Sequence, residues 1–332
     1  MTGSGLTAVQ FGLGPIGSRI ARAADGRGFE FVGAIDIDPD KVGRDLGAVA
    51  GFDDEIGVEV TDNAEAALAK NPDIVFHSTV SSLEVAKPQL VRVLSAEANV
   101  VSTTEELAYP WWSNASLGED LDDVATEHGV TLLGTGINPG FAMDTLPAVL
   151  STPMEAVDAV TVERVQDAGQ RRKPLQEKVG AGVSVETFEA DIADQAGHVG
   201  STESVAMLAD ALGFELDEID EAIEPVVADS VIETEHVRVR SGEVAGIRQT
   251  ARGIVDGDAV ISLDLEMYVG ADNPRDRVEF IGIPSVSITV EDGYHGDIAT
   301  AAVVTNVAST VVGAEPGLAT MLDIPTSFTR RV

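Results

Sequence analysis

The sequence predicts an α/β protein, with a doubly wound parallel sheet in its N-terminal part and a separate α+β domain after it. Over the first ~135 residues, apolar runs typical of buried strands alternate with segments of helical periodicity. From about residue 155, apolar and polar residues alternate instead, which is typical of a mixed or antiparallel sheet. The chain has 332 residues, 44% of them hydrophobic, which is enough for two domains with a core each.

The elements of the N-terminal domain follow one another as strand and helix. The predicted strands are residues 6–11, 30–36, 58–60, 73–77, 99–102 and 130–134, and the later predicted helices include 84–96 and 117–128.

The second domain is predicted from segments of different texture. Its strands are expected at 156–163, 235–240, 259–269 and 285–290, and its helices at 202–212 and 216–223. An Ala/Val-rich helix at 298–312 is expected to return to the first domain. The expected boundaries are therefore 1–140, with a return helix at about 297–328, and 141–296 for a domain that binds substrate and forms a dimer.

The first predicted strand runs directly into a glycine motif and then into a helix. Gly12 allows a tight turn, Gly14 lets the backbone approach a pyrophosphate, and Gly17 lets the helix pack on the strand. The helix begins at Pro15 and Ile16, and its positive end suits phosphate groups. This order of elements predicts a Rossmann domain that binds a dinucleotide, the alternative being a glycine-rich turn in a protein that binds no nucleotide.

An acidic residue at the end of the second predicted strand supports that prediction. Asp36 follows Gly17 by 19 residues, where an acid commonly binds the ribose hydroxyls of NAD. Its charge disfavours a 2′-phosphate, so NAD is the expected cofactor. Lys41 and Arg44 lie close enough in sequence to leave NADP open.

The charge of the chain is extreme and excludes several functions. It carries 56 acidic against 21 basic residues, a net charge of −35, and no cysteine. Such a carboxylate-rich, lysine-poor surface is typical of proteins from salt-accumulating halophiles, because high salt screens the repulsion. Because binding to phosphates needs a basic surface, we expect no nucleic-acid binding. We also expect no metal site. Since no signal peptide and no apolar run of ~20 residues is present, we expect no membrane association and a cytoplasmic location.

Ligands of doubly wound sheets bind beyond the carboxyl ends of the strands, so residues after the strands are site candidates. The segment after the fifth strand carries two glutamates, Glu105 and Glu106, before Tyr109 and Trp112. A carboxylate against aromatic walls has a raised pKa, which suits proton transfer. The alternative to a proton-transfer site is that Trp111 and Trp112 are core residues and that the glutamates begin a helix facing solvent. Strand alternation would let only one glutamate face the cleft.

Other residues after strands are expected around the cofactor or the substrate. The alternative for His77 is a structural role, as a histidine at a strand end whose ring hydrogen-bonds within the protein. A basic cluster at 164–178 is expected to hold an anionic group or to form an ion-paired subunit interface. The expected cofactor contacts after the strands are His77, Ser78, Thr79, Thr103, Thr104 and Asn138. The expected substrate contacts are Tyr109, Trp112, Phe141, Arg172, His198 and His295.

Eight segments along nearly the whole chain resemble the dihydrodipicolinate reductase-like superfamily. Within it, the chain is most similar to 2,4-diaminopentanoate dehydrogenases and native NAD(P)H-dependent amine dehydrogenases. The paired-histidine and lysine motif of true dihydrodipicolinate reductases is absent. The segments are 10–17, 33–43, 102–111, 134–141, 171–180, 197–200, 244–249 and 295–300.

This resemblance implies a homodimer, a second domain that closes over the substrate, and a catalytic glutamate after the fifth strand, either Glu105 or Glu106, with Glu106 favoured. The implied reaction interconverts an amine and a ketone plus ammonia with NAD(H) or NADP(H). A carboxylate must take a proton from the ammonium before its carbon can release hydride. The alternatives are an enzyme of the same superfamily acting on a cyclic imine or semialdehyde, and a non-catalytic NAD-sensing protein.

Overall fold

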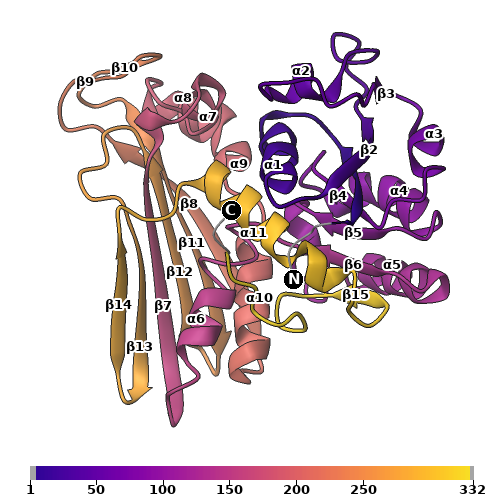
Figure 1. The fold of residues 1–332 in the computed structure, drawn as a ribbon. Helices are drawn as coiled ribbons and strands as arrows, with labels where there is room; N and C mark the ends of the chain where they lie inside the picture. The colour runs from indigo at the N-terminus through magenta and orange to yellow at the C-terminus, as the bar shows by residue number, and fades with distance from the viewer. Residues whose placement is uncertain (1–4, 330–332) are drawn as a thin grey trace. The chain divides into compact units, whose positions relative to one another are not determined.

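The computed structural model describes residues 5–329, in two compact units (Figure 1). Unit 1 consists of Met1–Phe141 and His295–Val332, and unit 2 consists of Ala142–Tyr294. The chain therefore leaves unit 1 after Phe141 and returns to it at His295.

Unit 1 is built on a seven-stranded sheet in which all neighbouring strands are parallel. The strand order is β15-β6-β5-β4-β1-β2-β3, so the order reverses between β1 and β4. In such a sheet this switch point is where ligands bind, outside the carboxyl ends of the strands. The strands are β1 (Thr7–Phe11), β2 (Glu30–Ile35), β3 (Val60–Thr61), β4 (Ile74–His77), β5 (Asn99–Ser102), β6 (Thr131–Gly134) and β15 (Gly317–Ala319).

Helix α1 begins at the glycine turn and packs its apolar face into the core of unit 1. Pro15 occupies its first turn, where a missing N–H costs nothing, and Ile20, Ala21 and Ala24 are buried beneath it. Helix α11, far along the chain, packs against α1. The other elements are α2 (Leu46–Ala50), α3 (Ala64–Leu68), α4 (Leu83–Leu94), the 3-10 turn η1 (Glu105–Leu107) and α5 (Ala115–His128), with α1 spanning Pro15–Asp25 and α11 spanning Gly296–Val311.

Unit 2 is a mixed six-stranded sheet, in the order β14-β13-β7-β12-β11-β8, with α10 (Ser201–Leu212) on one face. Only β12 and β7 are parallel neighbours within this sheet. The six strands of this sheet are β7 (Ala156–Asp167), β8 (Glu218–Val227), β11 (Val244–Val255), β12 (Asp258–Tyr268), β13 (Arg275–Ile283) and β14 (Val286–Glu291). Strands β9 (Ile232–Glu233) and β10 (Arg238–Val239) form a separate antiparallel pair. The remaining elements are α6 (Thr145–Leu150), η2 (Ala168–Gln170), α7 (Lys173–Lys178), α8 (Val185–Asp191) and α9 (Ala193–Ala196).

The structure confirms the predicted fold class, and it corrects several elements. Residues 216–223 were expected to form a helix, but most of them belong to strand β8. Ile219 and Ile223 are four residues apart, a spacing that places two side chains on one face of a helix and also on one face of a strand. The return helix ends at Val311 rather than near 328, and β15 follows it and pairs with β6.

Candidate active site

The glycine turn between β1 and α1 contains two glycines that the chain itself requires. Gly12 has φ +92°, and a Cβ there would lie 2.3 Å from the carbonyl oxygen of Ser78. A Cβ at Gly17 would lie 2.0 Å from the carbonyl oxygen of Gly12. Both positions therefore exclude a side chain by backbone packing.

Gly14 is different, because nothing in the chain requires a glycine there. Its φ is −65°, and a Cβ built on it would meet no atom within 4 Å. The first turn of α1, which follows, carries no acidic side chain. A space kept open at the positive end of a helix fits the close approach of a pyrophosphate.

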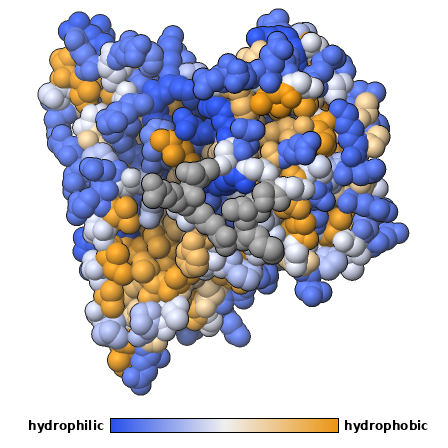
Figure 2. Space-filling view, viewed as in Figure 1, coloured by the Kyte–Doolittle hydropathy of each residue, from blue (hydrophilic) through white to orange (hydrophobic). Residues whose placement is uncertain are grey.

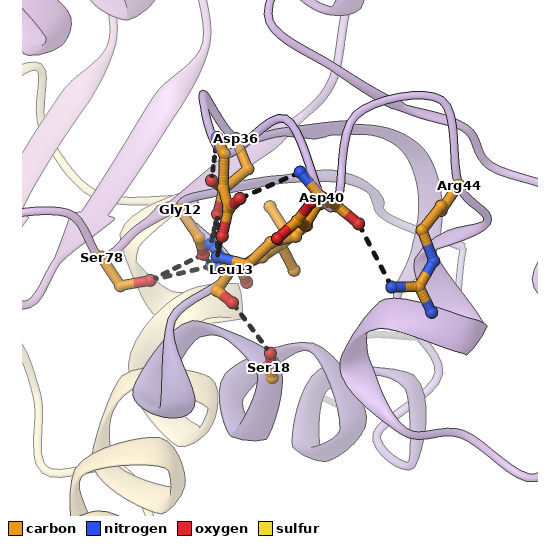
Figure 3. Close-up of polar contacts among 10 residues, drawn as sticks. Gly12, Leu13, Ser18, Asp36, Asp40, Arg44 and Ser78 are labelled. Atoms are coloured by element: carbon orange, nitrogen blue, oxygen red, sulfur yellow. Dashed lines mark hydrogen bonds and ion pairs between the residues drawn. The ribbon is translucent and has the colours of Figure 1, made fainter.

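Asp36 supports the glycine turn from the end of β2 (Figure 3). Its Oδ2 accepts a hydrogen bond from the Leu13 N–H at 2.8 Å, and its Oδ1 accepts one from the Asp38 N–H at 2.9 Å. Lys41 Nζ lies 3.1 Å from Oδ2. Burial alone would raise the pKa of Asp36, but these backbone donors and the Lys41 ammonium hold it below its ordinary value.

The turn after β4 is tied to the same place. Gln10 Nε2 donates to Ser78 Oγ at 3.0 Å and to the Gly12 carbonyl at 2.9 Å. Ser78 Oγ in turn donates to the Gly12 carbonyl at 3.2 Å, as Figure 3 shows. The two turns at the switch point are thus held as one preformed structure.

His77, one of the expected cofactor contacts, has its side chain inside unit 1. The ring is fully buried, and its Nδ1 lies 2.9 Å from Ser102 Oγ and its Nε2 2.8 Å from Gln89 Oε1. Burial lowers the pKa of His77 to about 4, so the ring is neutral at physiological pH. These hydrogen bonds favour the alternative interpretation of His77 as a structural residue, which links β4, β5 and α4.

The two glutamates lie in η1, and not on a continuing strand as their predicted alternation assumed. Glu106 Oε2 accepts a hydrogen bond from the Leu83 N–H at 2.7 Å, and the Glu106 N–H donates to the Ser81 carbonyl at 3.3 Å. Leu83 is the first residue of α4, so Glu106 caps that helix in place of Ser82, whose side chain makes no cap bond. The sequence could not show this contact, because 23 residues separate the two partners.

The threonines before the glutamates fasten η1 to the β4–α4 loop. Thr104 Oγ1 donates to the Val80 carbonyl at 2.9 Å, and the Thr103 N–H donates to the His77 carbonyl at 2.9 Å. Glu105 is half-buried and is the residue of η1 that directly follows this fastening. A carboxylate is therefore held near the carboxyl ends of the strands, as the glycine turn is, because parallel strands all end on the same side of the sheet.

The aromatic residues after η1 divide between core and surface. Trp111 packs against the core and contacts the place where Gly118 of α5 lacks a side chain. Trp112 is 42% exposed, and Tyr109 is half-buried. The core alternative therefore holds for Trp111, and Trp112 and Tyr109 remain candidates for a substrate wall.

The loop after β6 is buried and rests on α11. Asn138 is 8% exposed, and the Ile137 N–H donates to Thr300 Oγ1 at 3.3 Å. Phe141 is half-buried at the end of this loop. His295 is exposed and immediately precedes α11 in unit 1.

Two expected substrate residues, Arg172 and His198, belong to unit 2. Arg172 is exposed directly before α7. His198 lies in a turn clamped by Gln249, which accepts from the His198 N–H at 2.7 Å and donates to its carbonyl at 2.9 Å.

The basic residues at 164–178, all in unit 2, differ in their burial. Arg164 is buried, 2.6 Å from Asp276 Oδ1, and its Nη2 donates to the Tyr294 carbonyl at 2.8 Å. Lys173 pairs with Glu177 at the surface, 3.3 Å apart. Arg164 therefore has a structural ion pair, whereas Arg172 lies at the surface.

Sequence reasoning missed two apolar side chains near the glycine turn. Ile37 follows Asp36 and is 85% exposed, and Val80 in the β4–α4 loop is 37% exposed. Aliphatic side chains kept in water at strand ends suit contact with a planar base. The signal available in the sequence was an isoleucine between two aspartates.

Two further searches covered the described residues. Among residues 5–329, no group of three or more His, Cys, Asp or Glu side chains is placed to hold a metal ion. In the same part of the chain, no helix has the length and apolar character needed to span a membrane.

A parallel sheet with a glycine turn at its switch point defines a Rossmann-type dinucleotide-binding protein. Comparison with known proteins narrows this class. Residues 141–330 match the family of the 2,4-diaminopentanoate dehydrogenase C-terminal domain. The 2,4-diaminopentanoate dehydrogenase of Acetoanaerobium sticklandii is 33% identical over 263 residues, covering 77% of this chain and 74% of that protein.

The chain belongs to the 2,4-diaminopentanoate dehydrogenase family, and it is an oxidoreductase. An amine dehydrogenase of Streptomyces virginiae is 27% identical, covering 96% of both chains. The structure of amine dehydrogenase from Mycobacterium smegmatis is similar with a TM-score of 0.86 and 25% identity over 98% of both chains. These similarities extend over both units of the protein.

Proposed function

We propose that the protein is an NAD(P)-dependent amine dehydrogenase that oxidises a CH–NH2 group to an imine, which water hydrolyses to a ketone and ammonia. The observation that carries the proposal is the carboxylate-bearing turn η1, fastened to the β4–α4 loop beside the glycine turn in a chain of this family. A cofactor site and a proton-transfer group are thereby available at one edge of the sheet.

The residues at the switch point fit a nicotinamide dinucleotide. The open space at Gly14 and the acid-free first turn of α1 would take the pyrophosphate, and Pro15 and Ile16 would flank it. Ser78, Thr79, Thr103 and Thr104 follow the neighbouring strands, and Asn138 follows β6. The bound nicotinamide would supply the hydride acceptor or donor.

The protein's own contribution is a proton transfer. An ammonium cannot release hydride from its carbon, because the nitrogen lone pair is bound to a proton, so a carboxylate must first accept that proton. We assign this step to Glu105, which is half-buried in η1 directly after the threonines that join η1 to the β4–α4 loop. We assign Glu106 a positioning role, since its carboxylate accepts a hydrogen bond from the Leu83 N–H at the start of α4. This reverses the preference for Glu106 that the sequence suggested.

The substrate is proposed to be a small amine, a diamine or one derived from an amino acid. The contacts proposed in unit 1 are Tyr109, Trp112, Phe141 and His295. In unit 2, taken by itself, Arg172 and His198 are the proposed candidates. Their mixture of aromatic and cationic groups would suit an apolar chain that carries a carboxylate.

A cofactor-reduction screen tests this function. The purified protein is supplied with NAD+ or NADP+ and with diamines, monoamines and amino acids in molar KCl, and absorbance at the reduced-nicotinamide band is followed. Turnover with an amine and release of ammonia are expected. In a second arm, cyclic imines are supplied with NADH or NADPH and semialdehydes with NAD+ or NADP+. Turnover only in this second arm, or cofactor binding without turnover, would contradict the proposal.

We further propose a halophilic, cytoplasmic homodimer. Figure 2 shows a largely hydrophilic face, with an apolar area around α6, where Val149 is exposed. On the sheet face of unit 2 turned away from the buried Leu263 row, arginines alternate with carboxylates, as in the pairs Arg248–Asp264 and Arg275–Glu163. Such a face can complement a second copy of itself.

A KCl series tests both parts of that proposal. Because unscreened carboxylates repel one another, we expect the melting temperature and the dimer fraction in analytical ultracentrifugation to rise steeply with salt. A flat series would contradict the halophilic character, and a monomer at all salt concentrations would contradict the dimer.

A further inference from the structure

Two segments that lie far apart in the sequence, 197–200 and 244–249, meet in unit 2. The first is the turn before α10 and carries His198, and the second belongs to β11 and ends at Gln249. The Gln249 side chain is 2% exposed, so its amide lies inside the unit. This amide is directed at the backbone of His198, which is a proposed substrate contact.

We propose that Gln249 is a positioning residue, whose amide fixes the backbone of His198 so that the imidazole is held in a preformed place for the substrate. The role of His198 at the substrate rests on the proposed function, whereas the fixing of its backbone does not. In this assignment Gln249 itself contacts neither substrate nor cofactor.

The amide of Gln249 pairs with both backbone polar groups of one residue. Its Oε1 accepts a hydrogen bond from the His198 N–H at 2.7 Å, and its Nε2 donates to the His198 carbonyl at 2.9 Å. A side-chain amide carries a donor and an acceptor in one plane, as a peptide group does, so it can pair with His198 as a neighbouring strand would. An ionised carboxylate of the same length could satisfy only the N–H, and an apolar side chain could satisfy neither group.

Glu221 determines which way this amide points. Gln249 Nε2 also donates to Glu221 Oε1 at 2.6 Å and to Ser201 Oγ at 3.1 Å. An ionised carboxylate and a carbonyl only accept hydrogen bonds, so the NH2 group must face Glu221 and the His198 carbonyl. The amide oxygen is then left for the His198 N–H. The hydrogen bonds therefore favour one arrangement, and they join β8 and the first residue of α10 to the turn.

The turn depends on this support because it contains two glycines. Gly200 has φ +99°, a conformation that glycine adopts readily, and Gly197 lies so close to β8 that a Cβ would be 2.5 Å from Ile223 Cδ1. Val199 between them is 37% exposed. Ordering such a backbone before a ligand arrives lowers the entropic cost of binding. Gln249 is therefore expected to contribute to substrate affinity and not to the chemical step.

Hydrogen exchange tests the fixing of His198 without any turnover. The chain has five histidines, so labelling histidine alone with 15N gives at most five backbone amide signals, and His198→Gln identifies the signal of His198. Exchange is followed in constant KCl for wild type, Gln249→Met, Gln249→Asn and Gln176→Met. Methionine removes both hydrogen bonds at equal length, and asparagine keeps the amide but is one methylene shorter. Gln176 is the matched control, since its buried amide donates to the carbonyls of Gly169 and Arg171 at another turn of unit 2.

We expect the His198 N–H to exchange at least about 10-fold faster in both Gln249 variants and within about 2-fold of wild type in Gln176→Met, because only the Gln249 variants remove its acceptor. Equal protection in wild type and both Gln249 variants would overturn the inference. So would an equal acceleration in Gln176→Met, which would indicate a general loosening of unit 2.

Steady-state kinetics with an amine that the cofactor-reduction screen identifies test the role at the substrate. Gln249→Met should raise KM about 10-fold and leave kcat within about 3-fold, since affinity is affected and proton transfer is not. In a His198→Gln background the same substitution should raise KM less than about 2-fold, because a positioning residue has no further effect once its target side chain is gone.

An equal increase of KM in both backgrounds, or a fall in kcat alone, would overturn the inference, because a merely structural residue would act in either background. A wild-type protein that oxidises no amine would instead contradict the proposed function. The exchange rates would then still decide whether Gln249 fixes His198.

Discussion

Asp36 and Glu106 occupy equivalent places beyond the carboxyl ends of two strands of one sheet, and they use their carboxylates in the same way. Each follows a strand, β2 or β5, and accepts a hydrogen bond from a backbone N–H near the start of the helix that follows the neighbouring strand, Leu13 for Asp36 and Leu83 for Glu106. The difference is that Asp36 also has Lys41 as an ionic partner. An acidic residue after a strand can thus fix the loop of the neighbouring strand through a backbone N–H. Its remaining chemistry depends on its other partners, such as the ammonium of Lys41 beside Asp36.

The largest expected effect separates Glu105 from Glu106. Glu105→Gln keeps the shape of the side chain but removes the proton acceptor, so kcat for amine oxidation should fall about 10²–10⁴-fold. Glu106→Gln can still accept from the Leu83 N–H and should lose less than about 10-fold. Steady-state kinetics of both variants decide the assignment, and the opposite order would make Glu106 the proton-transfer residue.

The glycine turn permits a comparison between a glycine that the fold requires and one that it does not. Gly12→Ala should reduce the free energy of unfolding by about 3–4 kcal/mol, from the clash with Ser78 and the positive φ. Gly14→Ala should change it by less than about 1 kcal/mol but weaken NAD+ binding about 10-fold or more. Urea unfolding and cofactor titration measure the two quantities, and normal NAD+ affinity in Gly14→Ala would remove the pyrophosphate from this turn.

The buried His77 predicts a pH dependence of stability. The pKa of this ring is about 4 in the folded chain and about 6.5 in the unfolded chain. Below pH 6.5 the unfolded state therefore binds a proton that the folded state does not, and about 3 kcal/mol of stability is lost as the pH falls toward 4.

Urea unfolding of His77→Gln at pH 7 and pH 4.5 checks this prediction. The variant should lose less stability between the two values than wild type does, while His236→Gln, which replaces an exposed histidine, should follow wild type. Parallel curves for wild type and His77→Gln would show that His77 titrates normally.

The smallest expected effect concerns the cap of α4. Glu106→Ala removes the acceptor of the Leu83 N–H and should cost about 1 kcal/mol of stability, whereas Glu106→Gln should cost a few tenths. Equal stability of the two variants would show that the cap bond contributes nothing to the folded state.

The sequence predicted the strand and helix order of unit 1 and the glycine turn well, because these depend on local periodicity and short spacing. Unit 2 was harder, and β11 and β13 were not anticipated. In β11, Arg248 and Arg252 lie on the open face of the sheet among glycines, and pairing with β8 and β12 stabilises the strand. That stabilisation comes from distant segments, and local propensity does not record it.

At the candidate site, too, contacts between residues far apart in the sequence could not be predicted. The sequence could place Asp36 beside the glycine turn, because its separation from Gly17 along the chain is typical of the end of the second strand. The roles of His77 and Glu106 depend on Gln89, Ser102 and Leu83, which are brought to them only by folding. A pattern along the chain could nominate these side chains but could not tell a buried support from a group that meets a ligand.

The placement of β15 has a consequence for how the protein is made. One edge strand of the unit 1 sheet, β15, and the helix α11 that packs on α1 follow unit 2 along the chain. A ribosome adding about 5–20 residues per second needs on the order of ten seconds or more to synthesise the intervening unit 2. During that interval β6 has no β15 beside it, so this edge of the nascent sheet stays unpaired until β15 has been synthesised.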